Sequence, residues 1–226
     1  MIVTYEMLKQ IYQNYKAVDM KIKRMSDSKQ IVKLTKNLYE TNVSTAGYLV
    51  ANAIYSPSYL SFDYALAYYG LIPEAVYVYT SATFKKKKKK QYTNDLGIFT
   101  YRDVPPAVYP YGIKIIVEGE YCYAIATPEK AICDKLYTLK PVKNKKEMYR
   151  LLFHDLRIDM DLFKKLDLDD LNILCDVYSC TNIKILKKIV GDFYRTNFGA
   201  DGWKYNPKNN EEKKYEIKEV LQEMVL

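Results

Sequence analysis

The chain has 226 residues, of which 49% are hydrophobic, so it can bury a core and form one large domain or two small ones. This composition excludes a wholly disordered chain, and no apolar run approaches the roughly 20 residues that cross a bilayer. The formal net charge of +8 favours an anionic partner such as nucleic acid, although a basic surface without any partner would have the same composition.

The first 42 residues predict a small basic unit made of two helices and a hairpin. Apolar residues at helical spacing predict helices over Thr4–Tyr15, with Thr4 as N-cap, and over Ala17–Met25. Alternating residues predict two short strands, over Gln30–Leu34 and Leu38–Thr41. This order is typical of a compact winged helix-turn-helix, although the additional helix that usually precedes a recognition helix is missing.

Basic side chains follow the second helix and the hairpin of this unit. A winged helix places a helix in the major groove of DNA and its hairpin against the phosphate backbone. We therefore expect the helix to supply groove contacts and the hairpin to supply phosphate contacts, the candidates being Lys21, Lys23, Arg24, Lys29, Lys33 and Lys36. The alternative is a solvated face of a small α+β domain.

Residues 43–226 predict a second, α+β domain that begins with two helices. These cover Gly47–Tyr55 and Ser61–Gly70, with Ser61 as N-cap and Gly70 as a left-handed residue after the C-terminus. A sheet region follows at about 75–126. We expect its strands to be antiparallel because the connections are too short for crossover helices, and they cover Ala75–Phe84, Gly97–Val104, Ile113–Val117 and Tyr121–Ile125.

The remainder, about 127–226, predicts a helical region. Thr127 is placed to cap its first helix and Pro128 to occupy the first helical position. The further predicted helices cover Lys145–Phe153, Asp161–Lys165, Asp169–Tyr178, Asn182–Phe193 and Glu211–Met224.

Six consecutive lysines lie between two predicted strands. Like charges repel one another, so these side chains should not pack, and we expect a mobile, solvated tip. The functional alternative is a loop that contacts phosphates through Lys85, Lys86, Lys87, Lys88, Lys89 and Lys90.

Residues with the chemistry of a metal or catalytic site are sparse. The four cysteines have no zinc-like spacing and His154 is the only histidine, in the apolar context L-L-F-H-D-L, so we expect no zinc, no cofactor and a structural histidine. The N-terminus does not have the pattern of a secretory signal, and buried, reduced thiols in a cytoplasmic protein are the simplest expectation.

One group of charged residues allows a catalytic interpretation. Glu129, Lys130 and Asp134 lie on one predicted helix that follows a strand, as in part of a metal-dependent nuclease or transferase site. The structural interpretation is that Glu129 favours the positive end of the helix dipole and that Lys130 or Asp134 forms a surface pair. We favour the structural interpretation, and we expect no catalytic residues.

Several phrases of the sequence resemble one family. The N-terminal phrases are T-Y-E-M-L at Thr4–Leu8, K-I-K-R-M at Lys21–Met25 and I-V-K-L-T-K-N-L-Y at Ile31–Tyr39. The later phrases are S-Y-L-S-F-D-Y-A-L-A-Y-Y-G-L-I-P-E-A-V at Ser58–Val76, F-T-Y-R-D-V at Phe99–Val104 and A-T-P-E-K-A-I-C-D-K-L-Y at Ala126–Tyr137. In order and approximate spacing they are similar to the antitoxins of AbiE-type abortive-infection toxin–antitoxin systems.

The resemblance implies a type IV antitoxin and autorepressor. In that family a winged helix binds inverted repeats in the promoter, and the C-terminal part counters a nucleotidyltransferase-like toxin, with which a stable complex need not form. Asn37 stands where the family's wing often has glycine, and asparagine tolerates the positive φ of such a turn. The family-phrase residues that we expect to be structural are Tyr59, Ser61, Tyr69, Gly70, Pro73, Glu129, Lys130 and Asp134. A module that only binds a toxin through a tyrosine-rich surface remains the other non-enzymatic alternative.

Overall fold

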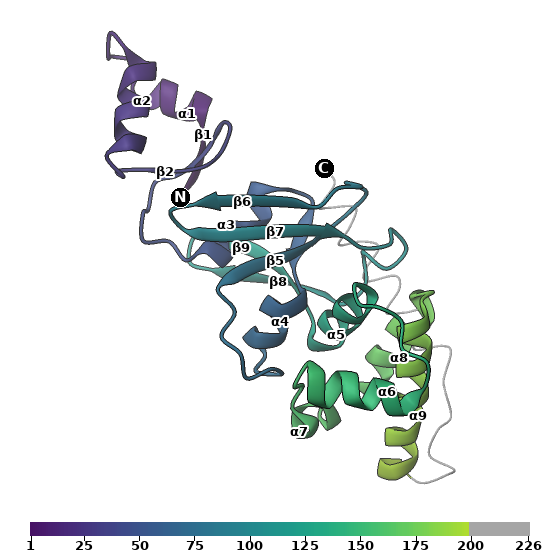
Figure 1. Cartoon of the computed structure of the whole chain (residues 1–226). Coiled ribbons are helices and arrows are strands. Elements are labelled where there is room, and N and C mark those ends of the chain that lie inside the picture. Colours follow the sequence, from purple (N-terminus) through teal and green to yellow (C-terminus); the bar gives the residue numbers. More distant parts are fainter. Residues whose placement is uncertain (199–226) are drawn as a thin grey trace.

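The computed structural model describes residues 1–198 and shows an elongated α+β protein (Figure 1). A small N-terminal unit lies at one end, a mixed sheet lies in the middle, and a group of helices lies at the other end. The α+β fold class is confirmed. The predicted helix Glu211–Met224 lies outside the described residues.

The N-terminal unit contains the predicted pair of helices and hairpin, preceded by a strand that was not predicted. Thr4 caps its first helix as expected, since its Oγ1 accepts a hydrogen bond of 3.2 Å from the backbone N–H of Met7. Asn37 has the expected positive φ, 125°, at the hairpin turn. The strands pair antiparallel in the order β1-β3-β2, and the elements are β1 (Ile2–Thr4), α1 (Tyr5–Ile11), α2 (Val18–Asp27), β2 (Val32–Thr35) and β3 (Leu38–Glu40).

Residues 31–34, which lead into and form most of β2, contribute to two separate hydrophobic cores. Within the N-terminal unit a small core is formed by Val3, Leu8, Ile22, Met25, Ile31 and Tyr39. Val32 and Leu34 belong instead to the large core of the rest of the protein. Because side chains alternate between the two faces of a strand, the outer face of the hairpin is covered by the sheet domain. Lys33, which lies between Val32 and Leu34, stays exposed.

The large sheet has six strands in the order β6-β7-β5-β4-β9-β8. Its strands are β4 (Ser58–Leu60), β5 (Val78–Thr83), β6 (Lys90–Asn94), β7 (Gly97–Asp103), β8 (Ile113–Glu118) and β9 (Tyr121–Ala126). The sheet is mixed and not antiparallel throughout as expected. The pairs β4–β5, β6–β7 and β8–β9 are antiparallel, whereas β5 pairs parallel with β7 and β4 pairs parallel with β9. The chain passes from β5 to the edge strand β6 and returns through a hairpin into β7, so two parallel neighbours need no crossover helix.

Helices pack on the sheet and against one another to close the large core. The helix α3 (Gly47–Ile54) contacts β4, β5 and β9, and α4 (Phe62–Tyr68) contacts β5 and α5 (Pro128–Tyr137). In turn α5 contacts β9, α8 and α9. The remaining elements are α6 (Lys145–Arg150), a π-helical turn (Leu151–Asp155), α7 (Met160–Lys164), α8 (Leu168–Val177) and α9 (Thr181–Phe198).

Many of the chain's tyrosines are structural. The rings of Tyr59 and Tyr101 are completely buried, and those of Tyr109, Tyr123 and Tyr178 are nearly so. They pack in edge-on pairs with neighbouring rings, for example Tyr59 with Tyr109 at a centroid distance of 5.1 Å. Among the described residues, no helix has both the length and the apolarity that crossing a bilayer requires.

Candidate nucleic-acid interface

The helix α2 turns one side toward the small core and the other toward solvent. Ile22 and Met25 are three positions apart, so both side chains reach the core. Lys23 and Arg24 lie between them in sequence and are exposed. The helical period therefore places Ile22 and Met25 on the core side of α2, and Lys23 and Arg24 on the solvent side. The exposed position of these two cations is the one expected for DNA contacts.

Lys21 is half-buried and is oriented by two aromatic rings. Its Nζ lies 5.2 Å from the ring centroid of Tyr15 and 5.9 Å from that of Tyr12. These cation–π contacts place Lys21 beside an open hollow of about 770 Å³, which Arg24 and the exposed Met20 also line. Aromatic, apolar and basic groups therefore meet at one concave surface of the N-terminal unit.

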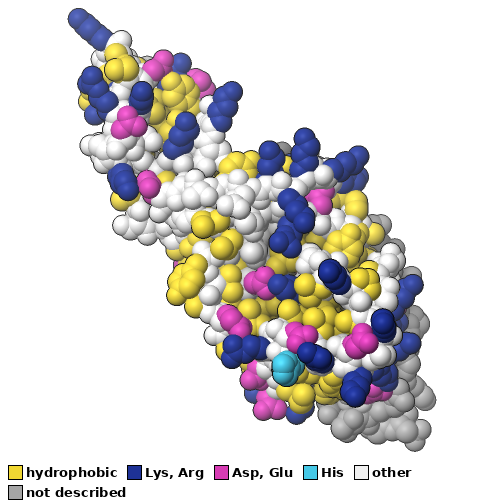
Figure 2. Space-filling view, viewed as in Figure 1, with side chains coloured by type: hydrophobic (Ala, Val, Ile, Leu, Met, Phe, Trp, Pro, Cys, Tyr) yellow, Lys and Arg dark blue, Asp and Glu magenta, His cyan; other side chains and the backbone are white. Residues whose placement is uncertain are grey.

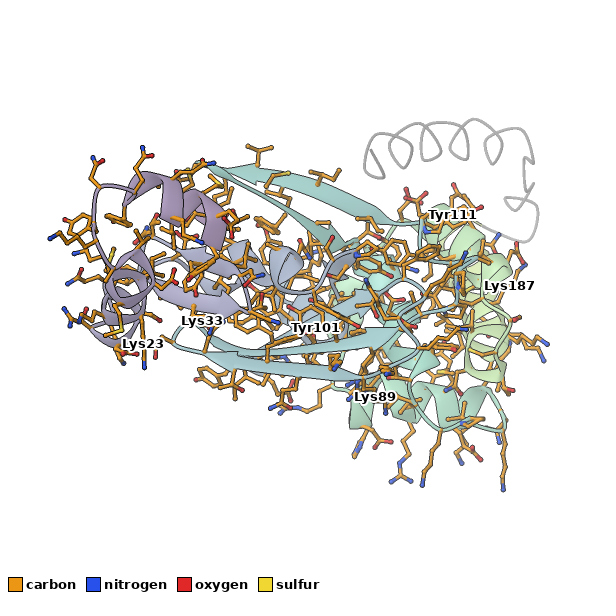
Figure 3. All side chains as sticks on the ribbon, turned by 90° about the horizontal axis from the view of Figure 1, so that it is seen from above. Lys23, Lys33, Lys89, Tyr101, Tyr111 and Lys187 are labelled. Carbon is orange, nitrogen blue, oxygen red and sulfur yellow. The ribbon has the colours of Figure 1, made fainter. Side chains whose placement is uncertain are left out.

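The hairpin brings two further predicted cations to the surface. Lys33 is exposed on β2 and pairs in register with Tyr39, whose ring packs on the small core. Figure 3 shows Lys23 and Lys33 on the same side of the unit. Lys36 is exposed beside the turn at Asn37. Four of the predicted cations, Lys23, Arg24, Lys33 and Lys36, are thus available to an external ligand.

Lys29 lies at the junction between the N-terminal unit and the sheet domain. It follows α2 with a left-handed backbone, φ 55°, and its Nζ lies 3.5 Å from Oδ1 of Asp95 in the turn between β6 and β7. Both side chains of this pair are exposed, so the pair is a weak one. The phosphate contact of Lys29 stays a prediction.

The lysine run lies in the connection between β5 and β6, where one carboxylate accepts hydrogen bonds from the backbone of the loop. Asp103, at the end of β7, accepts hydrogen bonds from the hydroxyl of Thr83 and from the backbone N–H groups of Lys86 and Lys87. Lys85 and Lys87 both have left-handed backbones, with φ of 54° and 57°. A single carboxylate thus organises the loop, and Lys90 already belongs to β6.

Glu129, Lys130 and Asp134 lie inside the protein, so the expected surface pair is buried. The Nζ of Lys130 donates hydrogen bonds of 2.7 Å to the carbonyl of Val108 and to the hydroxyl of Tyr178. It also lies 3.4 Å from Oδ1 of Asp134, and neither side chain is exposed. Glu129 accepts a hydrogen bond of 3.0 Å from the backbone N–H of Asp167, just before α8.

The carboxylate of Asp134 is surrounded by hydroxyl donors. Tyr59 donates a hydrogen bond of 2.9 Å and Ser61 one of 2.7 Å to Oδ2, and Tyr178 donates to Oδ1. Burial lowers the pKa of Lys130, and the nearby carboxylate opposes this shift in part. The pKa values of Tyr59 and Tyr178 lie well above their usual range, first because the rings are buried and then because Asp134 is negative. Every charged or polar group in this network has a partner within the protein.

The other family-phrase residues, Ser61, Gly70, Tyr69 and Pro73, lie in or beside α4. Ser61 occupies the N-cap position of α4, but its hydroxyl donates to Asp134 and makes no capping bond. Gly70 has the expected left-handed backbone, φ 70°. Tyr69 packs on the large core, and Pro73 is exposed in the segment that follows.

Some residues of these sites were not found from the sequence. Tyr178 completes the network around Asp134 from the end of α8, and no sequence signal connected it to α5. Asp103 lies within the phrase F-T-Y-R-D-V, but only the fold brings it to the lysine loop.

Histidine and cysteine provide no metal site in the described part of the chain. His154 is exposed, with Asp155 as its neighbour at 3.3 Å, and so is not the packed structural histidine that was expected. Cys133 and Cys175 are buried as expected, whereas Cys122 is exposed. No group of three or more potential metal-binding side chains occurs among residues 1–198.

Neither a protein-family model nor a curated protein sequence matches this chain.

Proposed function

We propose that this protein is an antitoxin of a type IV toxin–antitoxin system that binds its own promoter and represses transcription. In this proposal residues 1–42 act as a winged helix, and the remainder counters a nucleotidyltransferase-like toxin encoded beside it. The resemblance of the sequence phrases to AbiE-type antitoxins gives the proposal its system and its partners. The protein would act in the cytoplasm, where promoter DNA and the toxin are found.

The observation that carries the DNA-binding part is the position of Lys23 and Arg24. Both are exposed on α2, on the opposite side from the apolar anchors Ile22 and Met25. A helix that is anchored in this way can enter the major groove without disturbing the core. Lys33 and Lys36 of the hairpin would contact phosphates next to the groove, and Lys21 would lie at its edge beside the ring of Tyr15.

Two features of the described structure favour this proposal over catalysis at Glu129, Lys130 and Asp134 of α5. Lys130 and Asp134 have no exposed surface and Glu129 is 6% exposed. Their polar atoms are also occupied by groups of the protein itself. A substrate would have to open the core to reach them, so we assign these residues to the scaffold of the antitoxin domain.

Charge reversal on α2 tests the DNA-binding part. We expect K23E/R24E to abolish the gel shift of a duplex that carries the region upstream of the gene, while the wild-type protein shifts it. The matched control is K184E/K188E, which changes the net charge equally at two exposed lysines of α9. Unchanged binding by K23E/R24E, or equal loss in both variants, would contradict the assignment of α2 to the groove.

The antitoxin part needs a separate experiment. We expect co-expression of this protein to restore growth to cells that express the neighbouring nucleotidyltransferase-like protein. K23E/R24E should restore growth equally well when transcribed from an unrelated promoter, because the antitoxin domain is unchanged. Failure of the wild-type protein to restore growth would refute antitoxin activity and leave DNA binding intact.

A further inference from the structure

The six-stranded sheet ends at β6 on one side and at β8 on the other. The edge at β6 is protected, because β2 of the N-terminal unit contacts it (Figure 1). Figure 2 shows lysine and arginine side chains over the same part of the sheet. A covering element and charged side chains are common means of keeping another strand from pairing with a sheet edge. Among the described elements, β8 has extensive contacts only with β9, so its outer edge is open.

The backbone of β8 directs the hydrogen-bonding groups of alternate residues to this open edge. The carbonyl of Gly112, directly before the strand, accepts a hydrogen bond of 2.8 Å from the backbone N–H of Thr127, in the same register as the β8–β9 pair. In an antiparallel pair the bonded residues alternate, so the even-numbered residues of β8 bond to β9. Ile115 and Val117 therefore direct their N–H and C=O groups away from β9.

The side chains of the same two residues are exposed. Ile115 is 45% exposed and Val117 is 75% exposed, the largest fractions among the aliphatic side chains of the six strands. Cys122, which lies opposite Val117 on β9, is also exposed. An apolar edge strand with free backbone groups is a surface on which a further strand can pair.

The sequence of β8 is complementary to itself when a second copy runs antiparallel to it. If Ile116 faces Ile116 of the second copy, Lys114 lies opposite Glu118 and Ile115 lies opposite Val117. Opposite charges then meet on one face of the joined strands, and aliphatic side chains meet on the other. The backbone agrees with this register, because Ile115 and Val117 both direct their bonding groups outward.

The two charged side chains are free to make these contacts. Lys114 is exposed and has no ion pair with any residue of 1–198. Glu118 is also exposed, and its Oε1 accepts a hydrogen bond of 2.7 Å from the hydroxyl of Tyr48. Its Oε2 is left for the ammonium group of a facing lysine.

We infer that β8 is a self-association surface, on which a second copy of this chain adds its own β8 antiparallel, with the twofold axis at Ile116. The sheets of the two copies then join into one continuous sheet. A single strand edge is smaller than a standard interface of about 1,600 Å², so the dimer is a weak one. The inference goes beyond the proposed function and does not depend on it.

Disulfide crosslinking in the full chain tests the pairing and its register. Two copies of Ile116→Cys would face each other as a non-hydrogen-bonded pair with Cα atoms about 4.5 Å apart, which a disulfide can span. The background chain carries serine in place of Cys122 and Cys180, whereas Cys133 and Cys175 are buried. Oxidised glutathione accepts the two electrons and two protons of the thiols and leaves as two reduced molecules. We expect a covalent dimer on a non-reducing gel.

The matched control is Val117→Cys. Val117 is more exposed than the half-buried Ile116, so random collisions would crosslink it faster. In the inferred dimer, however, the Cα atoms of the two copies of residue 117 lie roughly 8–9 Å apart, which is too far for a disulfide. We expect Val117→Cys alone to crosslink at least about tenfold more slowly, and its mixture with Ile115→Cys to crosslink. Equal rates for Ile116→Cys and Val117→Cys, or no dimer of Ile116→Cys, would overturn the inference.

Charge reversal tests the facing pairs without any cysteine. Lys114→Glu and Glu118→Lys each place like charges opposite one another at two symmetric positions, so we expect each to weaken self-association about tenfold. The double variant K114E/E118K restores opposite charges and should return to within about threefold of the wild type. Analytical ultracentrifugation over a concentration series measures the association, and thermal unfolding verifies that each variant is folded. A double variant as weak as the single variants would overturn the inference.

Two further variants distinguish β8 from other contact surfaces. Ile115→Pro removes an N–H that points to the open edge, at a position where an edge strand accepts proline, and should abolish self-association. K23E/R24E leaves β8 unchanged and should associate like the wild type. Persistence of the dimer in Ile115→Pro, or its loss in K23E/R24E, would place the contact elsewhere and overturn the inference.

Discussion

The Nζ of Lys130 lies 3.4 Å from Oδ1 of Asp134, one helical turn away on α5, and neither residue has any exposed side-chain surface. Taking two charges out of water is costly, and the cost is offset only where each charge keeps good partners. Here a backbone carbonyl and the hydroxyls of Tyr59, Ser61 and Tyr178 supply them. The pair therefore links α5 to β4, α4 and α8 in one polar network.

Removing the cation alone should be severely destabilising. We expect Lys130→Met to lower the free energy of unfolding by about 3–5 kcal/mol, because Asp134 would remain charged and buried. Urea denaturation at pH 7 measures this. The control on the same helix is Lys135→Met, which breaks a partly exposed pair with Asp63 and should cost about 1 kcal/mol or less.

The double variant K130M/D134L tests whether the two residues act together. Since it removes both charges of the pair and leaves neither one unpaired, it should be more stable than Lys130→Met alone. If the double variant lost as much unfolding free energy as Lys130→Met and Asp134→Leu lose together, the coupling would be contradicted.

High pH should destabilise the protein through its buried tyrosines. Below pH 10 these side chains hold their protons in both the folded and the unfolded states, so their contribution to stability is complete. Above pH 10 the unfolded tyrosines ionise while Tyr59 and Tyr178 do not, because their folded-state pKa values are well above the usual range. The unfolding free energy then falls by about 1.4 kcal/mol per pH unit for each of them.

The lowered pKa of Lys130 affects stability in the opposite direction, and over a lower range of pH. Its folded-state pKa is below the usual value, so its contribution rises with pH up to about 10.4 and is constant above that. Urea denaturation between pH 8 and 11, followed together with tyrosinate absorbance, should show a steep loss above pH 10. Tyr69→Phe provides a control, since the folded-state pKa of Tyr69 is raised to about 12 by burial, and its replacement should make the loss shallower. An unfolding free energy that stays constant between pH 10 and 11 would contradict the prediction.

Asp103 should control the order of the lysine loop. In Asp103→Ala the hydroxyl of Thr83 and the backbone N–H groups of Lys86 and Lys87 lose their acceptor, which should cost about 1–3 kcal/mol. Hydrogen exchange at the amides of residues 86 and 87 should become much faster. Exchange at the amide of Leu96, which donates to Asn94 in the next turn, should stay the same and serves as the internal control. Unchanged exchange at 86 and 87 would show that the loop does not depend on this carboxylate.

Two glycines should respond differently to alanine. A Cβ at Gly47 would lie 2.2 Å from Cε2 of Tyr79 and 2.8 Å from the carbonyl oxygen of Leu96, so we expect Gly47→Ala to cost about 2 kcal/mol or more. At Gly119 a Cβ would meet nothing within 4 Å, and only the left-handed backbone, φ 60°, opposes it. Gly119→Ala should therefore cost about 1 kcal/mol. Thermal unfolding ranks the two, and the reverse order would contradict the packing at Gly47.

Local signals in the sequence predicted much of the fold. The caps at Thr4 and Thr127 and the left-handed Gly70 are decided by neighbouring residues, and all three are confirmed. The strand β6 was missed because it begins in the lysine run and ends at Asn94, and lysine and asparagine are depleted in strands. Tyr92 and Thr93 alone are too short a signal, and pairing with β7 completes the strand. The parallel pairing of β5 with β7 was missed for a related reason, since it depends on where β6 lies.

The candidate sites were predicted less completely than the fold. The helical period alone places Lys23 and Arg24 on the solvent side of α2, and there the prediction agrees with the structure. Lys130 or Asp134 was expected to form a surface pair, but the two pair with each other in the interior. Their burial depends on Tyr59 and Tyr178, which come from distant parts of the chain. Burial of a charge is a property of the assembled core, so spacing within one helix does not predict it.

The segment of residues 31–34 has a mechanical consequence for how the N-terminal unit would meet DNA. Ile31 anchors the unit's own core, whereas Val32 and Leu34 are anchored in the core of the sheet domain. A rotation of the unit about this segment would pull apolar side chains out of one core or the other, and so would cost burial. In the proposed function, the sheet domain would therefore limit the angles at which α2 approaches a duplex.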